Sequence, residues 1–196
     1  MKLKKAAMFG LDARIALAIF GALSVISGAA LYSAIQDSKV TSIITQLDNL
    51  GKAYESYYLD TGLELDIVQS GVWLDIPQLV TSTENGWQGP YFNAEVTSTH
   101  TLAYPGHSSY LLAAMFDKDW TAATQAAWDQ AKCGTGSLGG ECYVWVGFND
   151  VDLDFRNQID LEIDGAVDGA TGRVRHFRSS GLNNYTFIKY MPIKKY

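Results

Sequence analysis

An uncharged run of 21 residues near the N-terminus, residues 15–35, constrains this chain more than any other feature. Its sequence is IALAIFGALSVISGAALYSAI, and a helix of this length would be about 30 Å long. That length matches the hydrocarbon core of a bilayer. Lys2, Lys4 and Lys5 precede the run, on the side expected to stay cytoplasmic. The run therefore predicts a membrane-spanning helix.

The helical pattern continues beyond this run. No proline occurs before Pro77, and Thr61-Gly62 is the first good helix stop. We therefore expect one helix of about 50 residues, from near Met8 to Asp60. It should be apolar all round over residues 8–36 and amphipathic over residues 37–62. Apolar residues recur at three- and four-residue steps in the second part, at Val40, Ile43, Ile44, Leu47, Leu50, Tyr54, Tyr57 and Tyr58.

Three interpretations of this N-terminus compete. One is a plain transmembrane anchor. The second is a secretory signal peptide, because a basic start, an apolar stretch and small residues at 27–30 suit an ordinary signal peptidase. A cleaved signal peptide, however, has no reason to be continuous with an amphipathic helix. The third interpretation depends on a short motif.

Residues 8–29, MFGLDARIALAIFGALSVISGA, resemble the N-terminus of type IV pilins and type II secretion pseudopilins. Mature chains of that family begin with a few apolar residues, then an acid, then a run similar to AIIGIL. Aligning that run with residues 18–23 places Asp12 at the acidic position. The implied leader is residues 1–7, cut by prepilin peptidase between Ala7 and Met8, with N-methylation at Met8.

Two residues depart from the family pattern. Ala7 stands where the family usually has Gly, and Asp12 stands where Glu is usual. A rival register, with cleavage after Gly10, would put Ile15 at the acidic position and remove the function of the acid.

Asp12 is the candidate assembly residue. A carboxylate at the edge of a bilayer is costly unless it is paired. The resemblance implies that Asp12 of one subunit neutralises the new amine at Met8 of its neighbour. Arg14 would either reach the headgroups or pair with Asp12. The alternative is an ordinary acid near a helix start, favoured by the helix dipole.

After Gly62, aromatic-rich segments alternate with turn clusters, which predicts strands. One short helix is expected between Asp117 and Lys132, with Asp119 as a possible N-cap, and no helix beyond it. The fold class is therefore α+β, a pilin-like layout in which a long N-terminal helix packs on the antiparallel sheet of a head at 63–196. The expected strand segments are 71–80, 85–92, 108–116, 142–148, 173–177 and 184–193. Short resemblances to the family also occur at residues 87–91 and 163–175.

Cys133 and Cys142 bracket a glycine-rich loop. In an exported head they would lie in an oxidising compartment and form a disulfide, which would contribute about 2–3 kcal/mol. The same loop contains Gly134-x-Gly136-x-x-Gly139, formally a dinucleotide fingerprint. It lacks the strand–helix context that such a site needs, so we discount it.

Eight acids and one base occupy residues 141–168. Calcium prefers several oxygen ligands brought together by a turn. The resemblance favours such a site, since major pseudopilins bind calcium near their C-terminal end. The alternating acids of residues 160–164 also suit a strand with its acids in water. The candidate calcium ligands are Asp160, Glu162, Asp164 and Asp168.

Charge and composition disfavour several classes of function. The formal net charge is −6, and removal of the three lysines of the leader makes it −9, which disfavours nucleic-acid binding. The basic residues of 173–195 could pair with the acidic segment within a head or between heads. His107 is in no nucleophile elbow, and the five tryptophans suit a core better than a sugar site. We do not expect an enzyme.

The expected function is that of a structural subunit of a type IV pilus-like filament. Its implied partners are other copies of the chain, the bacterial inner membrane, prepilin peptidase and an assembly platform, and its location is the periplasm or cell surface. One alternative is a pseudopilin of a type II secretion system. The other is a singly anchored or secreted binding domain that does not assemble, in which replacement of Asp12 by Ala would be harmless.

Overall fold

The computed structural model describes residues 3–104, 107–150, 152–179 and 184–196. Side chains are described from Gly10 onward, apart from those of Tyr104, His107 and Ser108. The chain divides into two compact units, Met1–Ser42 and Ile43–Tyr196. We call them the N-terminal unit and the head and describe each by itself.

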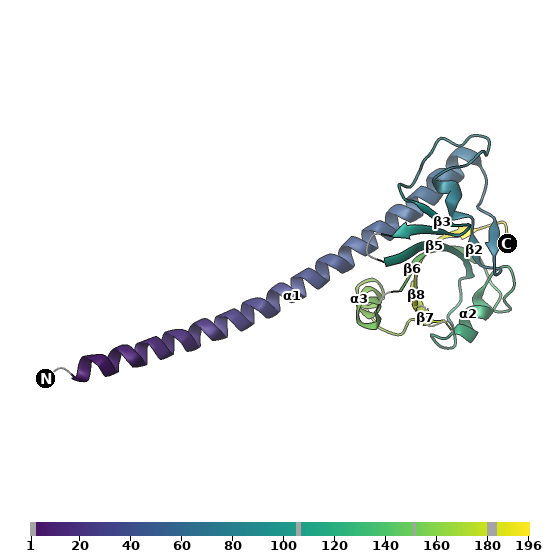
Figure 1. The fold of residues 1–196 in the computed structure, drawn as a ribbon. Helices are drawn as coiled ribbons and strands as arrows, with labels where there is room; N and C mark the ends of the chain where they lie inside the picture. Colours follow the sequence, from purple (N-terminus) through teal and green to yellow (C-terminus); the bar gives the residue numbers. More distant parts are fainter. Residues whose placement is uncertain (1–2, 105–106, 151, 180–183) are drawn as a thin grey trace. The chain divides into compact units, whose positions relative to one another are not determined.

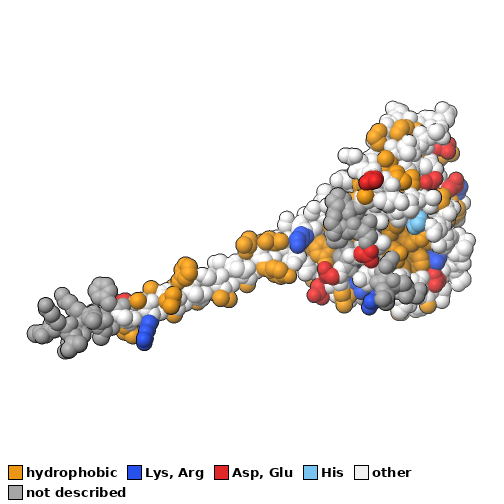
Figure 2. Space-filling model, viewed as in Figure 1, with side chains coloured by type: hydrophobic (Ala, Val, Ile, Leu, Met, Phe, Trp, Pro, Cys, Tyr) orange, Lys and Arg blue, Asp and Glu red, His pale blue; other side chains and the backbone are white. Residues whose placement is uncertain are grey.

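The described residues of the N-terminal unit all belong to helix α1, which runs from Leu3 to Thr61 (Figure 1). Its large apolar side chains from Leu11 to Ile35 are exposed, and Figure 2 shows hydrophobic atoms spread along this helix. Of the described residues, only those of α1 form a helix long and apolar enough to cross a membrane. The exposed apolar side chains are Leu11, Ile15, Leu17, Ile19, Phe20, Leu23, Val25, Ile26, Leu31, Tyr32 and Ile35.

Helix α1 ends where the sequence predicted. Gly62 has a φ of +69°, in the left-handed region that glycine adopts without strain, and its N–H donates to the carbonyl of Tyr58 at 2.8 Å. The hydroxyl of Thr61 donates to the carbonyl of Tyr57 at 2.7 Å. Both bonds satisfy carbonyls that the end of a helix leaves open.

The head contains one antiparallel sheet of eight strands, which confirms the α+β class. Its main path is β1-β2-β5-β6-β8-β7, with β4 paired to β5 and β3 paired to β4. A 3₁₀ turn, η1 (Ile76–Leu79), follows β2. The strands are β1 (Ile67–Gln69), β2 (Trp73–Leu74), β3 (Val96–Ser98), β4 (Thr101–Tyr104), β5 (His107–Phe116), β6 (Cys142–Asn149), β7 (Val174–Arg178) and β8 (Asn184–Ile193).

The part of α1 inside the head packs on the sheet. Leu47 and Leu50 are fully buried. Gly51 lies against the ring of Tyr190 on β8, where a larger residue would force that ring to move. The hydroxyl of Tyr110 on β5 donates to Oε1 of Gln46 at 2.7 Å. The amphipathic pattern is therefore confirmed over the head part of α1.

The strands of the head curl round (Figure 1), and several of them contribute buried side chains to one hydrophobic core. This core is aromatic: the rings of Trp128 and Phe177 stack with centroids 4.7 Å apart. Trp145 is fully buried and donates its indole N–H to the carbonyl of Met115 at 3.1 Å. Tryptophan in this head is thus mainly a core residue.

Helix α2 (Gln125–Ala131) lies inside the expected helical segment but begins later. Thr124 is its N-cap and accepts from the N–H of Ala127, so the predicted cap at Asp119 is wrong. Asp119 instead pairs with Arg175.

Helix α3 (Leu153–Asp164) corrects the expectation that no helix follows α2. Asp152 caps its N-terminus, and Gly165, with a φ of 73°, ends it. Residues 160–164 therefore belong to a helix, and the strand interpretation of their alternating acids is wrong. The buried Phe155 and Ile159 are four residues apart, which is the helical spacing. Residues 85–92 also form no strand, and only Trp73 and Leu74 do so in 71–80.

Candidate functional site

The predicted processing and assembly residues lie in the first turns of α1. The side chains of Ala7 and Met8 fall outside the described residues, so cleavage between them stays a prediction. Asp12 is exposed, and it has no ion pair or hydrogen bond with any residue that the structure describes. Arg14 is also exposed. Side chains two apart on a helix do not face each other, so Arg14 is poorly placed to neutralise Asp12.

Three exposed glycines lie on the surface of the N-terminal unit. A methyl group added at Gly10, Gly21 or Gly28 would meet no described atom within 4 Å. Small residues on an apolar helix let another helix approach closely. These positions are therefore suited to contact between helices of different chains.

The predicted disulfide is present. Cys133 and Cys142 are joined, with an S–S distance of 2.08 Å and a Cα–Cα distance of 6.1 Å. The bond links the residues after α2 to the first residue of β6. The N–H of Cys133 donates to the carbonyl of Ala114 at 3.1 Å, so backbone bonding also holds this loop to β5.

Three of the four candidate calcium ligands hold the loop between α3 and β7. Oδ2 of Asp160 accepts from the N–H groups of Asp168 and Gly169 at 3.1 and 2.9 Å. Oδ2 of Asp164 accepts from the N–H groups of Arg173 and Val174 at 2.7 and 2.8 Å. These carboxylates fix the loop by satisfying its backbone donors.

Asp168 is the third candidate ligand that holds this loop, and Glu162 is the fourth candidate. Asp168 accepts from the N–H groups of Ala170 and Thr171, both at 2.8 Å, and from the hydroxyl of Thr171 at 2.6 Å. The hydroxyl and these N–H groups lower the pKa of Asp168. Glu162 is exposed on α3.

The described residues contain no group of three His, Cys, Asp or Glu side chains arranged to hold a metal ion. Calcium binding by the acidic segment stays a prediction. It would have to compete with the backbone N–H groups that already occupy these carboxylates.

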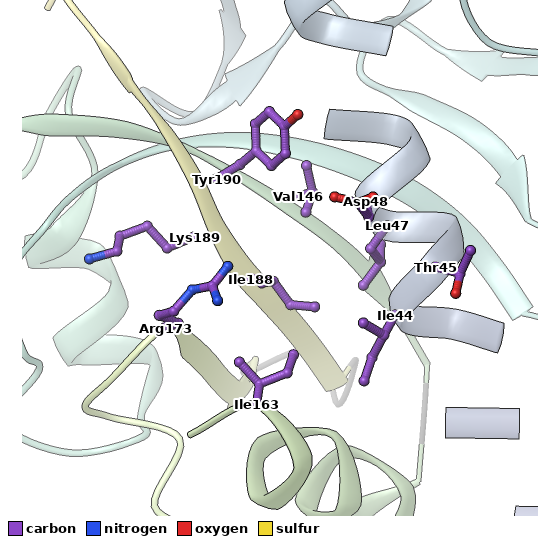
Figure 3. A pocket seen from close by; sticks show the side chains of 10 residues that line it. All are labelled: Ile44, Thr45, Leu47, Asp48, Val146, Ile163, Arg173, Ile188, Lys189 and Tyr190. Atoms are coloured by element: carbon purple, nitrogen blue, oxygen red, sulfur yellow. The ribbon is translucent and has the colours of Figure 1, made fainter. Parts of the chain in front are cut away.

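A groove of ≈ 260 Å³ lies between the head part of α1, strand β8 and the end of α3 (Figure 3). Ile44, Ile163 and Ile188 give it an apolar floor. The guanidinium of Arg173 projects over it, whereas Lys189 points away and pairs with Asp117 at 2.8 Å. The groove combines this apolar lining with one arginine, Arg173, and one acid, Asp48. Sequence reasoning did not find it.

A buried polar group under α3 was also missed. His176 on β7 is 6% exposed, and its Nε2 lies 3.4 Å from Oδ2 of the fully buried Asp160. Burial, followed by the charge of Arg156, lowers the pKa of His176 to about 4. Burial raises the pKa of Asp160. Four consecutive residues of β7, Val174 to Phe177, are buried, so no alternation along this strand marks the histidine or identifies its partner.

In comparisons with family models, curated proteins and solved structures, the chain matches none of them.

Proposed function

We propose that this chain is a structural subunit of a type IV pilus-like filament, held in a membrane before it assembles through α1. The observation that carries the proposal is the exposed, uncharged and apolar surface of the N-terminal unit over residues 15–35. This helix leads without interruption into an amphipathic part that packs on the sheet of a disulfide-bonded head.

The apolar surface needs an apolar environment. Exposed patches of this kind mark contacts with membranes or other proteins, because water is a poor solvent for them. Lipid supplies that environment before assembly, and the helices of neighbouring subunits supply it afterwards. Transfer from lipid to protein gains little from the hydrophobic effect, so close packing at small residues such as Gly21 and Gly28 must favour assembly.

The charge of Asp12 adds specificity to that packing. An unpaired carboxylate is costly in an apolar interior. In the proposed filament it pairs with the amine that cleavage creates at Met8 of a neighbouring subunit. An incoming subunit would then be stabilised only at the register that brings the two charges together.

The first experiment determines the intact mass and the N-terminal peptide of the protein from native membranes and from sheared surface filaments. We expect a chain that starts at N-methylated Met8 and is enriched in the sheared fraction. A chain that still starts at Met1, or one cut near Ala30, would refute the proposal and leave an anchored or secreted domain. A processed chain that stays with the membrane would favour the pseudopilin alternative, whose filament is short.

A further inference from the structure

The groove of Figure 3 has room for an apolar side chain from outside the head. Its isoleucine floor comes from three elements, the head part of α1, the end of α3 and strand β8. Its volume is ≈ 260 Å³. A cavity of about 150 Å³ with an apolar lining is large enough to hold benzene, so a leucine side chain would fit into this groove.

The unpaired charge at the groove is positive. Asp48 pairs with Lys52 at 2.6 Å. Lys189 points away and pairs with Asp117, as described above. Arg173 is exposed, and its guanidinium has no acid partner among the residues that the structure describes. An occupant that brings an acid beside an apolar side chain would therefore complement the groove.

Helix α3 offers such a pair on its outer face. Leu161 is 55% exposed, although Phe155 and Ile159 of the same helix are buried. Glu162 follows Leu161 directly and is also exposed. It is the candidate calcium ligand that does not hold the loop after α3, and within the described part of the chain it forms no ion pair or hydrogen bond.

The groove of a chain is out of reach of its own Leu161. Leu161 and Ile163 are two residues apart in α3, so their side chains point to different sides of the helix. Ile163 faces the groove (Figure 3). Leu161 therefore faces away from it, and only another copy of the chain can bring Leu161 there.

We propose that Leu161 and Glu162 of one copy dock into this groove of a second copy, with Leu161 on the isoleucine floor and Glu162 paired with Arg173. The two contacting surfaces differ, so each copy in the contact keeps one surface free for a further copy. Such a contact repeats along an assembly. The inference rests on the proposed function, because it adds a contact between heads to the packing of α1 in a filament.

The test is cysteine cross-linking of the full chain in sheared filaments under a mild oxidant. Cells express two forms together, Thr45→Cys in the wall of the groove and Gln158→Cys, an exposed position one turn before Leu161. Neither substitution removes a residue proposed to dock. The native cysteines are bonded to each other and do not compete. We expect disulfide-linked dimers when both forms are present and few when either is expressed alone. One chain with both substitutions should give a ladder of multimers, because the contact repeats.

Reversal of the charges tests the pairing. Arg173→Glu or Glu162→Arg should each lower the amount of cross-linked dimer by about tenfold, since each places like charges together. The two reversals combined should restore most of it, which damage to the fold of the head could not do. Arg178→Glu is the matched control, because Arg178 is an exposed arginine of the same head that does not line the groove, and it should leave the cross-link near normal.

The outcomes separate this contact from the proposed function. Filaments of chains that start at Met8 but give no cross-link would overturn the contact and leave the proposed function standing. A chain missing from the sheared fraction would refute the proposed function and the contact with it. An equal loss in Arg178→Glu, or no recovery when the two reversals are combined, would also overturn the contact.

Discussion

The two parts of helix α1 are both rich in apolar residues, but they bury them differently. In the N-terminal unit, Leu23 is 58% exposed and Phe20 is 70% exposed. In the head, Leu47 and Leu50 are fully buried. The difference lies in the width of the apolar surface. An apolar stripe on one side finds its partner in the sheet of the same head, whereas an apolar surface on every side needs lipid or several other chains.

Apolar content alone therefore does not say what buries a helix. The head part of α1 packs against its own chain, as its hydrogen bond to β5 and its contact with β8 show. In the N-terminal unit, described by itself, the large apolar side chains from Leu11 to Ile35 are exposed. Substitutions that are chemically alike should consequently have opposite effects in the two parts.

The largest effect should come from charge in the N-terminal unit. Asp12→Ala removes the carboxylate proposed to pair with the Met8 amine, and the amount of sheared filament should fall by about tenfold or more, since an unpaired charge in an apolar interior costs several kcal/mol. Filament yield is measured by quantifying the protein in sheared and cell-bound fractions.

Asp37→Ala is the matched control, since Asp37 is an exposed acid of the same helix that lies beyond the uncharged run. It should leave the filament yield near normal. Equal yields for Asp12→Ala and the unmodified chain would contradict the role of Asp12 and favour a domain that does not assemble. Equal losses in both variants would mean that any acid in α1 matters, not the one at position 12.

The second prediction compares two leucines of α1. Leu50→Ala should destabilise the head by about 2–5 kcal/mol, because it leaves a cavity between the helix and the sheet. Leu23→Ala should change head stability by less than about 0.5 kcal/mol, because that side chain is 58% exposed and substitutions of exposed side chains have small effects. Urea unfolding of the full chain in non-ionic detergent, followed by tryptophan fluorescence, measures both.

The reverse ranking should hold for assembly. Leu23→Ala should lower filament yield while the head stays folded. If Leu23→Ala destabilised the head as much as Leu50→Ala, the two parts of α1 would not be distinct in the way described above.

Much of this fold was accessible from the sequence. The end of α1 at Thr61, the disulfide and the central strands follow from local signals, and β8 (Asn184–Ile193) coincides with the expected segment 184–193. Helix α3 was missed because its acids at 160, 162 and 164 alternate as a strand would. Its apolar residues Phe155, Ile159 and Ile163 had the helical spacing throughout.

The polar sites could not be predicted in the same way. The bonds from Asp160 and Asp164 reach backbone groups eight to ten residues ahead, which depends on how the loop after α3 turns back. The buried pair of Asp160 and His176 is formed by residues of two elements, α3 and β7. No local pattern encodes such a meeting, so it emerges only when α3 is placed over the edge of the sheet.

The smallest predicted effect lies in the head and depends on pH. At neutral pH, His176 is neutral in both the folded and the unfolded chain. Between its ordinary pKa of 6.5 and the folded value of about 4, the unfolded chain binds a proton that the folded chain does not. Acidification therefore favours unfolding, and the head should lose about 2 kcal/mol between pH 7 and pH 5. Urea unfolding in chloride buffers measures this loss.

His176→Gln should remove most of this pH dependence, and His100→Gln should keep most of it. Both histidines have pKa values lowered by burial, but only His176 also faces the charge of Arg156. Asp160 acts in the opposite direction: its raised pKa lets the folded head take up a proton more readily than the unfolded chain. The variant His176→Gln separates the two effects, because it removes the imidazole and keeps Asp160. A flat profile in the unmodified head, or an unchanged slope in His176→Gln, would show that the histidine is not held neutral by its surroundings.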